Sequence, residues 1–293
     1  MHPRQSDISF KDSGDFLNWW FEKPRLDGRA AITFSNYYTN YENNFHGYLK
    51  GIWSDRHLEL DQELDALKKK GGVEILDLGC GTGSVSLYMG HKLQGTGQVL
   101  GVDINKERLF CASERKRVME RELGVTVDCE FSESNVLSLP LDRKFDLIYL
   151  EEALHHMEPR PEIIKRISGL LRDWGVLIIS EVNPYNPLMQ IRVFRERGFR
   201  TIRKRLGQDG KECLYGVERI IPAGQVARVF GDYDLRVVSL RYFRIACAKL
   251  AKAIDREGRY LMGLERRLCR IPFLSKVLSV HYNMVLQKAG GHL

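Results

Sequence analysis

The stretch Glu74–Gly90, EILDLGCGTGSVSLYMG, joins an apolar run, three closely spaced glycines and a segment with helical spacing. This order predicts a buried strand, a tight turn and a helix. Glycines at 79, 81 and 83 let the backbone turn sharply and approach a ligand without side-chain collision. We therefore expect residues 79–83, called the glycine loop below, to bind a ligand.

The residues around the glycine loop exclude two common ligands. A phosphate-binding GxxxxGK[ST] loop needs a lysine, and the first lysine after this turn is Lys92. A dinucleotide fingerprint needs glycine or alanine at position 84, where this chain has Ser84. Asp77, at the end of the strand, would repel a pyrophosphate. A carboxylate at that place suits a cationic ligand instead.

A second acidic residue, Asp103 in VLGVDIN, ends the next apolar run, where a carboxylate accepts hydrogen bonds from ribose hydroxyls. A ligand with a ribose and a positive charge but no pyrophosphate matches S-adenosylmethionine. At these motifs the chain resembles the class I S-adenosylmethionine-dependent methyltransferases, of the type 11/12 kind. The resemblance covers about Val73–Val182.

The resemblance implies roles for individual residues. The methionine portion of S-adenosylmethionine is assigned to Asp77, Gly79, Cys80, Gly81 and Gly83, the ribose to Asp103, the adenine to Ile104 and Asn135, and the methionine end also to Glu151, with Val136 as a further cofactor contact. Asn135 stands where the family usually has aspartate, and its carbonyl still accepts from the adenine amino group. For a proton lost by the acceptor, the candidate bases are His156, Glu152 and Tyr37. No metal ligand set is expected.

Apolar runs alternate with helical segments along the chain, which predicts a parallel sheet covered on both faces. The expected fold is α/β: a Rossmann-like, doubly wound, mostly parallel seven-stranded sheet with an N-terminal helical lid and helical insertions near the C-terminus. We expect a lid over residues 1–72, a cofactor-binding core over 73–183, and substrate-shaping insertions with the last two strands over 184–293.

Composition and termini indicate a folded cytoplasmic protein. No apolar leader and no run of about 18 apolar residues occurs in the 293 residues. Six scattered cysteines without a CxxC pair argue against a disulfide framework and structural zinc. We expect the cysteines to be small buried residues.

The charge is unevenly distributed. Residues 184–293 hold 22 Lys+Arg against 9 Asp+Glu, a balance of +13, which leaves 23 against 29, or −6, for residues 1–183. Seven basic residues within 192–205 alternate with apolar ones, a pattern typical of a helix on an anionic surface. We expect a small-molecule acceptor, with lipid-linked, isoprenoid and glycan metabolites as classes, and peripheral contact with an anionic membrane. The alternatives are an RNA methyltransferase and a non-catalytic cofactor-binding partner; the oligomeric state stays open.

Overall fold

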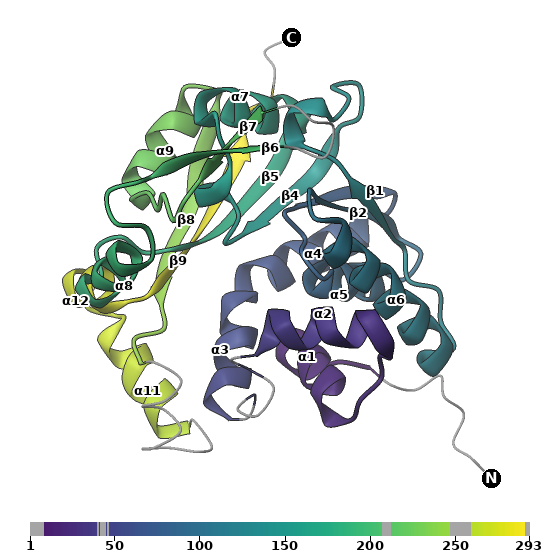
Figure 1. Ribbon diagram of the computed structural model, residues 1–293. Helices are drawn as coiled ribbons and strands as arrows, with labels where there is room; N and C mark the ends of the chain where they lie inside the picture. The colour runs from purple at the N-terminus through teal and green to yellow at the C-terminus, as the bar shows by residue number, and fades with distance from the viewer. Residues whose placement is uncertain are drawn as a thin grey trace. The chain divides into compact units, whose positions relative to one another are not determined.

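The computed structural model describes residues 9–39, 41, 45, 47–206, 212–246 and 259–290. Its main sheet has seven strands in the order β3-β2-β1-β4-β5-β9-β8 (Figure 1). The strands are β1 Val73–Leu78, β2 Gly97–Asp103, β3 Cys129–Glu133, β4 Phe145–Glu151, β5 Leu171–Val182, β8 Leu235–Phe243 and β9 His281–Lys288. β9 runs antiparallel to β5 and β8, and the other pairings described are parallel. The expected α/β class with a mostly parallel seven-stranded sheet is confirmed.

The chain forms two compact units, residues 1–135 with 246–264 and residues 136–245 with 265–293. Among its described residues, the first unit holds β1–β3 and the helices α1 Ser13–Glu22, α2 Gly28–Tyr38, α3 Tyr48–Arg56, α4 Leu58–Lys70, α5 Ser84–Leu93 and α6 Lys106–Leu123. Helices α4, α5 and α6 pack on these strands, α1 packs on α3 and α5, and α2 packs on α6. The N-terminal helices are therefore part of the same core as the glycine loop.

Local sequence signals place the ends of these helices. Asn105 caps the first turn of α6 by accepting from the N–H of Arg108 at 3.1 Å, and Gly124 ends α6 in the left-handed region. α4 ends in three lysines followed by Gly71, with φ 68°. These basic last turns and glycine stops favour the observed boundaries because they stabilise the carbonyl end of each helix.

The second unit holds β4, β5, β8 and β9. Its elements also include the short 3-10 helices η2 Val136–Ser138 and η3 Leu154–His156, with α7 Arg160–Leu170, α8 Pro187–Arg197, α9 Ala223–Gly231 and α12 Pro272–Leu278. Helix α11, Arg259–Leu268, crosses the boundary between the units. Helices α7 and α9 pack on the strands of this unit, and η3 contacts β5. Along the chain, α11 and α12 lie between the two late strands β8 and β9, as the sequence predicts. Residues 247–258 of that insertion lie outside the described residues.

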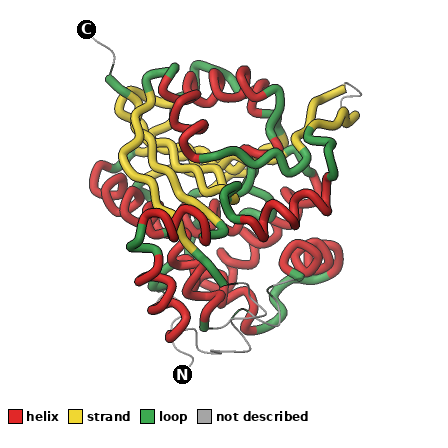
Figure 2. Tube along the Cα trace, turned by 90° about the vertical axis from the view of Figure 1, so that its left-hand side faces the viewer, coloured by secondary structure: helices red, strands yellow, loops and turns green. Residues whose placement is uncertain are grey.

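One element departs from expectation. The basic segment 192–205 is not a single helix: α8 ends at Arg197, Gly198 follows with φ 59°, and the chain continues into β6 Ile202–Leu206. β6 pairs antiparallel with β7, Glu212–Gly216, as a separate two-stranded sheet (Figure 2). Gly198 stops the helix because it adopts a backbone conformation that side-chain-bearing residues avoid.

Candidate functional site

The glycine loop adopts the sharp turn predicted for it. Gly79, Gly81 and Gly83 have φ values of 79°, 55° and 77°, all in the region that favours glycine. The N–H groups of Gly79 and Cys80 donate to the carbonyl of Val102 at 2.7 and 3.1 Å. The start of the loop is thus held against the end of β2.

Asp103 is bound directly to this loop. Its Oδ2 accepts from the backbone N–H of Gly81 at 2.9 Å, and its Oδ1 accepts from the N–H of Asn105 at 2.8 Å. The carboxylate is buried, with 7% of the residue exposed. A carboxylate has about four acceptor positions, so each oxygen can accept one further hydrogen bond. Asp103 therefore fits the two hydroxyls of a ribose.

Asp77, near the end of β1, is a second buried carboxylate, and its charge acts on Cys80 of the glycine loop. The hydroxyl of Ser86 donates to its Oδ2 at 2.5 Å. Burial first, and then the negative charges of Asp77 and Asp103, raise the pKa of the Cys80 thiol well above its usual value. Cys80 therefore stays a neutral thiol, and the two carboxylates make its surroundings negatively charged. This environment suits the sulfonium and ammonium charges of S-adenosylmethionine better than a phosphate.

Tyr37, a predicted candidate base, lies against the glycine loop. A Cβ added to Gly81 would stand 2.7 Å from the Tyr37 hydroxyl. The guanidinium of Arg108, on α6, lies 5.1 Å from the centre of the Tyr37 ring. Of the three candidate bases, Tyr37 is the one in the same unit as Asp77 and Asp103.

Arg115, a buried arginine that the sequence does not single out, is hydrogen-bonded to the glycine loop. Arg115, on α6, is fully buried, and its Nη1 donates to the Thr82 carbonyl at 2.8 Å and to Ser84 Oγ at 2.6 Å. Its guanidinium lies 4.4 Å from the Trp20 ring centre and 4.9 Å from that of Phe34. Burial lowers the pKa of Arg115. Arg115 thus ties the N-terminal helices to the residues that begin α5.

The remaining predicted residues divide between the two units. Ile104 and Asn135 belong to the first unit and are exposed. Val136, in the second unit, is 5% exposed. Glu151 there accepts from the Tyr149 hydroxyl at 2.9 Å. The division of the chain into the two units therefore falls between Asn135 and Val136 in the sequence.

Glu152 follows β4 in a strained conformation, with φ 46°. Its N–H donates to the Ser180 carbonyl at 2.8 Å, and its Oε1 lies 3.3 Å from Nδ1 of His281. The side chain is 42% exposed. Its position, at the carboxyl end of a parallel strand, is where α/β folds gather ligand-binding groups.

The two histidines of η3 have different surroundings. His155 is buried, and its Nδ1 lies 2.6 Å from Oε2 of Glu181. Burial alone would lower the pKa of His155, but the carboxylates of Glu181, Glu218 and Glu152 raise it to about 9. His156 is 31% exposed, and its Nδ1 lies 2.9 Å from the Gly216 carbonyl.

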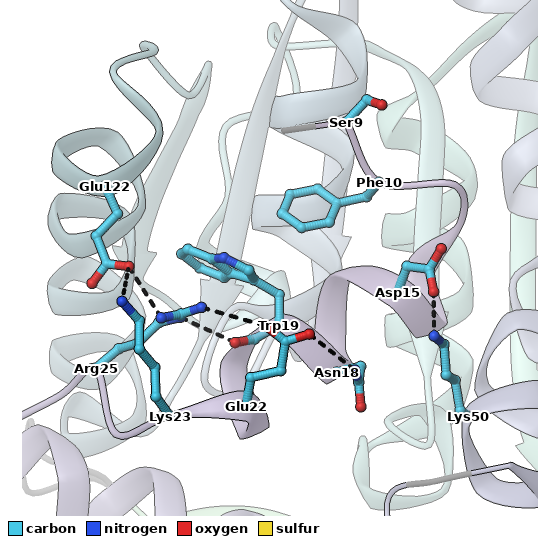
Figure 3. Close-up of a pocket in the computed structure, with 10 residues that line it drawn as sticks. All are labelled: Ser9, Phe10, Asp15, Asn18, Trp19, Glu22, Lys23, Arg25, Lys50 and Glu122. Carbon is cyan, nitrogen blue, oxygen red and sulfur yellow. Dashed lines mark hydrogen bonds and ion pairs between the residues drawn. The ribbon is translucent and has the colours of Figure 1, made fainter. Parts of the chain in front are cut away.

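A separate cavity of about 550 Å³ lies in the first unit (Figure 3). Arg25 stacks over Trp19 at 3.8 Å and its Nη1 lies 3.1 Å from Glu122 of α6. Lys23 also reaches Glu122, at 3.7 Å. None of the predicted site residues lines this cavity. Its charged groups join the N-terminal segment to α6.

Comparison with known proteins identifies the class of protein that this fold and loop define. A family model described as a methyltransferase domain matches residues 69–217, about half of the chain. The chain belongs to this family of methyltransferase domains. The resemblance to methyltransferases drawn from the motifs is thereby confirmed.

Individual relatives share modest identity with the chain. Phosphoethanolamine N-methyltransferase 1 of Zea mays is 28% identical over 214 residues, which cover 66% of this chain and 40% of that protein. Erythromycin 3''-O-methyltransferase of Saccharopolyspora erythraea is 28% identical over 188 residues, 60% of each chain. The chain spans 30 to 40% of the length of the plant phosphoethanolamine methyltransferases that it matches.

Among solved structures, magnesium protoporphyrin IX methyltransferase from Synechocystis PCC 6803, with bound S-adenosylmethionine, is similar in fold. Its TM-score is 0.51 at 13% identity, and the alignment covers 96% of this chain and 100% of that chain. At this identity the likeness establishes the fold alone.

Proposed function

We propose that this protein transfers the methyl group of S-adenosylmethionine to a small-molecule acceptor. The observation that carries the proposal is the junction of the glycine loop with Asp103, through the N–H of Gly81. Asp103 would bind the ribose. Asp77 and the backbone of the glycine loop would hold the methionine portion.

The remaining predicted contacts complete the cofactor site in this proposal. Ile104 and Asn135 would contact the adenine, Val136 would be a further cofactor contact, and Glu151 would lie at the methionine end. S-adenosylmethionine supplies an already activated methyl group, so the protein contributes mainly alignment and exclusion of water. Alignment of this kind can be worth several orders of magnitude in rate.

An acceptor hydroxyl or acidic carbon must also lose a proton during transfer. Tyr37, Glu152 and His156 are the groups proposed to take it. The contact of the Tyr37 hydroxyl with Gly81 supports Tyr37. The strained backbone of Glu152 supports Glu152, since strain of this kind gathers at functional sites.

The small-molecule part of the proposal is supported by the relatives. Their names describe methyltransferases of phosphoethanolamine, demethylmenaquinone, rifamycin and erythromycin compounds. These acceptors differ widely in structure, and the matched region of each relative is limited. We therefore propose the class of acceptor and leave its identity to experiment.

An exposed apolar surface on α8 and the turn that follows it, residues 188–200, supports contact with an anionic membrane. Leu188 is 76% exposed, Ile191 51%, Phe194 50% and Phe199 90%. The exposed arginines of the same segment are Arg192, Arg195 and Arg200. Apolar side chains flanked by arginines favour the boundary between lipid headgroups and acyl chains. No helix within the described ranges is long and apolar enough to cross a bilayer.

Methyl-labelled S-adenosylmethionine tests the proposal. The protein is incubated with separate small-molecule, lipid and RNA fractions, and with an Asp103→Ala variant as the inactive control. We expect label in the small-molecule or lipid fraction with the unaltered protein only. Label confined to RNA would establish the alternative, an RNA methyltransferase. No label in any fraction, despite cofactor binding, would favour a non-catalytic partner.

A further inference from the structure

Two adjacent histidines in the second unit direct the same ring nitrogen toward one carboxylate. Nε2 of His155 lies 4.0 Å from Oε2 of Glu218, and Nε2 of His156 lies 3.9 Å from Oε1 of Glu218. The donor atoms of His155, His156 and Glu218 all lie within 4.8 Å of one another. These three residues are called the His-His-Glu cluster below.

Hydrogen bonds at the opposite ring nitrogens determine the tautomers. Nδ1 of His155 faces the carboxylate of Glu181 at 2.6 Å, and Nδ1 of His156 faces the carbonyl of Gly216 at 2.9 Å. Both partners can only accept, so each Nδ1 carries its proton and donates. When a ring is neutral, its Nε2 then carries the lone pair that can bind a metal ion. Protein histidines that bind metals are oriented in the same way, by a carboxylate or carbonyl at the second nitrogen.

The charges around the cluster favour a cation. Glu181, Glu218 and Glu152 all act on His155. From α8, Arg192 faces Glu218 and Glu152, and its Nε is itself paired with Glu196 at 2.9 Å. Arg160 of α7 faces Glu181. The carboxylates that favour a proton on His155 would also favour a divalent cation, which would displace the proton from Nε2.

The β6–β7 hairpin brings Glu218 to the histidines. Met157 forms a bridge with Tyr215, whose ring stacks on His156 with a centroid distance of 4.8 Å. A Cβ on Gly216 would stand 2.3 Å from the His155 carbonyl, so only glycine allows this approach. Glu218 itself has φ 46°. A strained glutamate held against two histidines indicates a positioned group.

We propose that the His-His-Glu cluster binds a divalent transition-metal ion. Two ligand atoms at about 2.1 Å from one cation lie at most about 4.2 Å apart. The distances from His155 Nε2 to Oε2 of Glu218 and from His156 Nε2 to its Oε1 are within this limit, and the three donor atoms, which lie within 4.8 Å of one another, would draw together on binding. Imidazole and carboxylate ligands favour Zn²⁺, Co²⁺, Fe²⁺ or Ni²⁺ over Mg²⁺ and Ca²⁺. Three protein ligands leave coordination positions for water. With the cation bound, His156 is a ligand and not a base.

This inference is independent of the proposed function, because metal binding is read directly. Co²⁺ is titrated into the full chain after treatment with chelator, with visible absorption and calorimetry as readouts. The variants are His156→Ala and Glu218→Gln, and the matched control is Glu212→Gln on the same hairpin, whose carboxylate pairs with Lys204. Circular dichroism checks that each variant is folded.

We expect one Co²⁺ per chain, without the intense thiolate band that cysteine ligands produce. His156→Ala and Glu218→Gln should each weaken binding at least about tenfold, the size of effect known for groups supporting a metal site. Glu212→Gln should bind like the unaltered protein. Absence of Co²⁺ binding to the folded unaltered protein would overturn the proposal. Equal affinity in the folded His156→Ala and Glu218→Gln variants would overturn it too.

Discussion

The backbone N–H of Gly81 lies 2.9 Å from Oδ2 of Asp103, so the glycine loop and the end of β2 form one hydrogen-bonded structure. The groups proposed to bind the ribose and the methionine portion are therefore positioned together. A change at either residue should disturb both contacts, because neither carboxylate nor loop can move without breaking this bond.

Gly81→Ala should weaken S-adenosylhomocysteine binding. Its φ of 55° would cost alanine about 1–2 kcal/mol, and the new Cβ would meet the Tyr37 hydroxyl at 2.7 Å. Combining it with Tyr37→Ala removes the collision but not the backbone strain. We expect calorimetry to show partial recovery in the double variant. Additive losses would show that Tyr37 does not press on the loop.

Arg115→Ala should destabilise the first unit. It removes bonds to the Thr82 carbonyl and Ser84 Oγ and leaves a space beside Trp20. We expect the free energy of unfolding in urea to fall by about 2–4 kcal/mol. Arg117→Ala, on the same helix with a side chain 73% exposed, is the control and should change it by less than about 0.5 kcal/mol. Similar values for both variants would refute the supporting role of Arg115.

His91 should make the protein less stable in acid. Burial first, and then the positive charge of Lys68, lower its pKa. Below about pH 6.5 the unfolded chain binds a proton that the folded one resists, so stability falls as the pH falls. The slope from one such group reaches at most about 1.4 kcal/mol per pH unit.

Urea unfolding at several pH values compares the unaltered protein with His91→Leu. We expect the variant to lose less stability between about pH 6.5 and the lowered pKa of His91. Its absolute stability can change through packing against Phe10, whose ring lies 5.2 Å from that of His91. The decisive readout is therefore the slope. Identical slopes would show that His91 does not titrate differently on folding.

The exposed surface of α8 and the turn that follows it should bind anionic vesicles. Replacing Ile191 and Phe199 by serine removes apolar area that would enter the membrane, and should reduce cosedimentation with phosphatidylserine-containing vesicles at least about tenfold. Leu141→Ser, at a residue 47% exposed in the same unit, is the control. Added salt should weaken binding through the arginines. Equal binding to neutral and anionic vesicles, or no binding to anionic vesicles, would refute the proposed membrane contact.

The strands and the glycine loop could be predicted because their signals are local. Alternating apolar runs place seven strands, and three glycines after a strand indicate the turn. Arg115 could not be predicted, since a basic residue in ERKRV looks like a solvated helix face. Its burial depends on Trp20 and Phe34, distant in sequence.

Two features of the second unit could not be predicted from the sequence either. The basic pattern of 192–205 predicts one helix, but Gly198 ends it and the hairpin partner of β6 lies beyond. Glu218 is about sixty residues from His156, and tertiary contacts such as the pairing of Met157 with Tyr215 bring the two segments together. Spacing along the chain therefore carries no signal for the His-His-Glu cluster.

Calorimetric titration with S-adenosylhomocysteine tests the cofactor site most directly. We predict micromolar binding to the unaltered protein and to Asp142→Ala, an exposed control, but a loss of roughly a hundredfold, about 2.7 kcal/mol, in Asp103→Ala. Thermal melting checks that Asp103→Ala is folded, and NAD should not bind. Equal affinity for S-adenosylhomocysteine in Asp103→Ala and the unaltered protein would contradict the assignment of Asp103 to the ribose, and no binding by the folded unaltered protein would contradict the account itself.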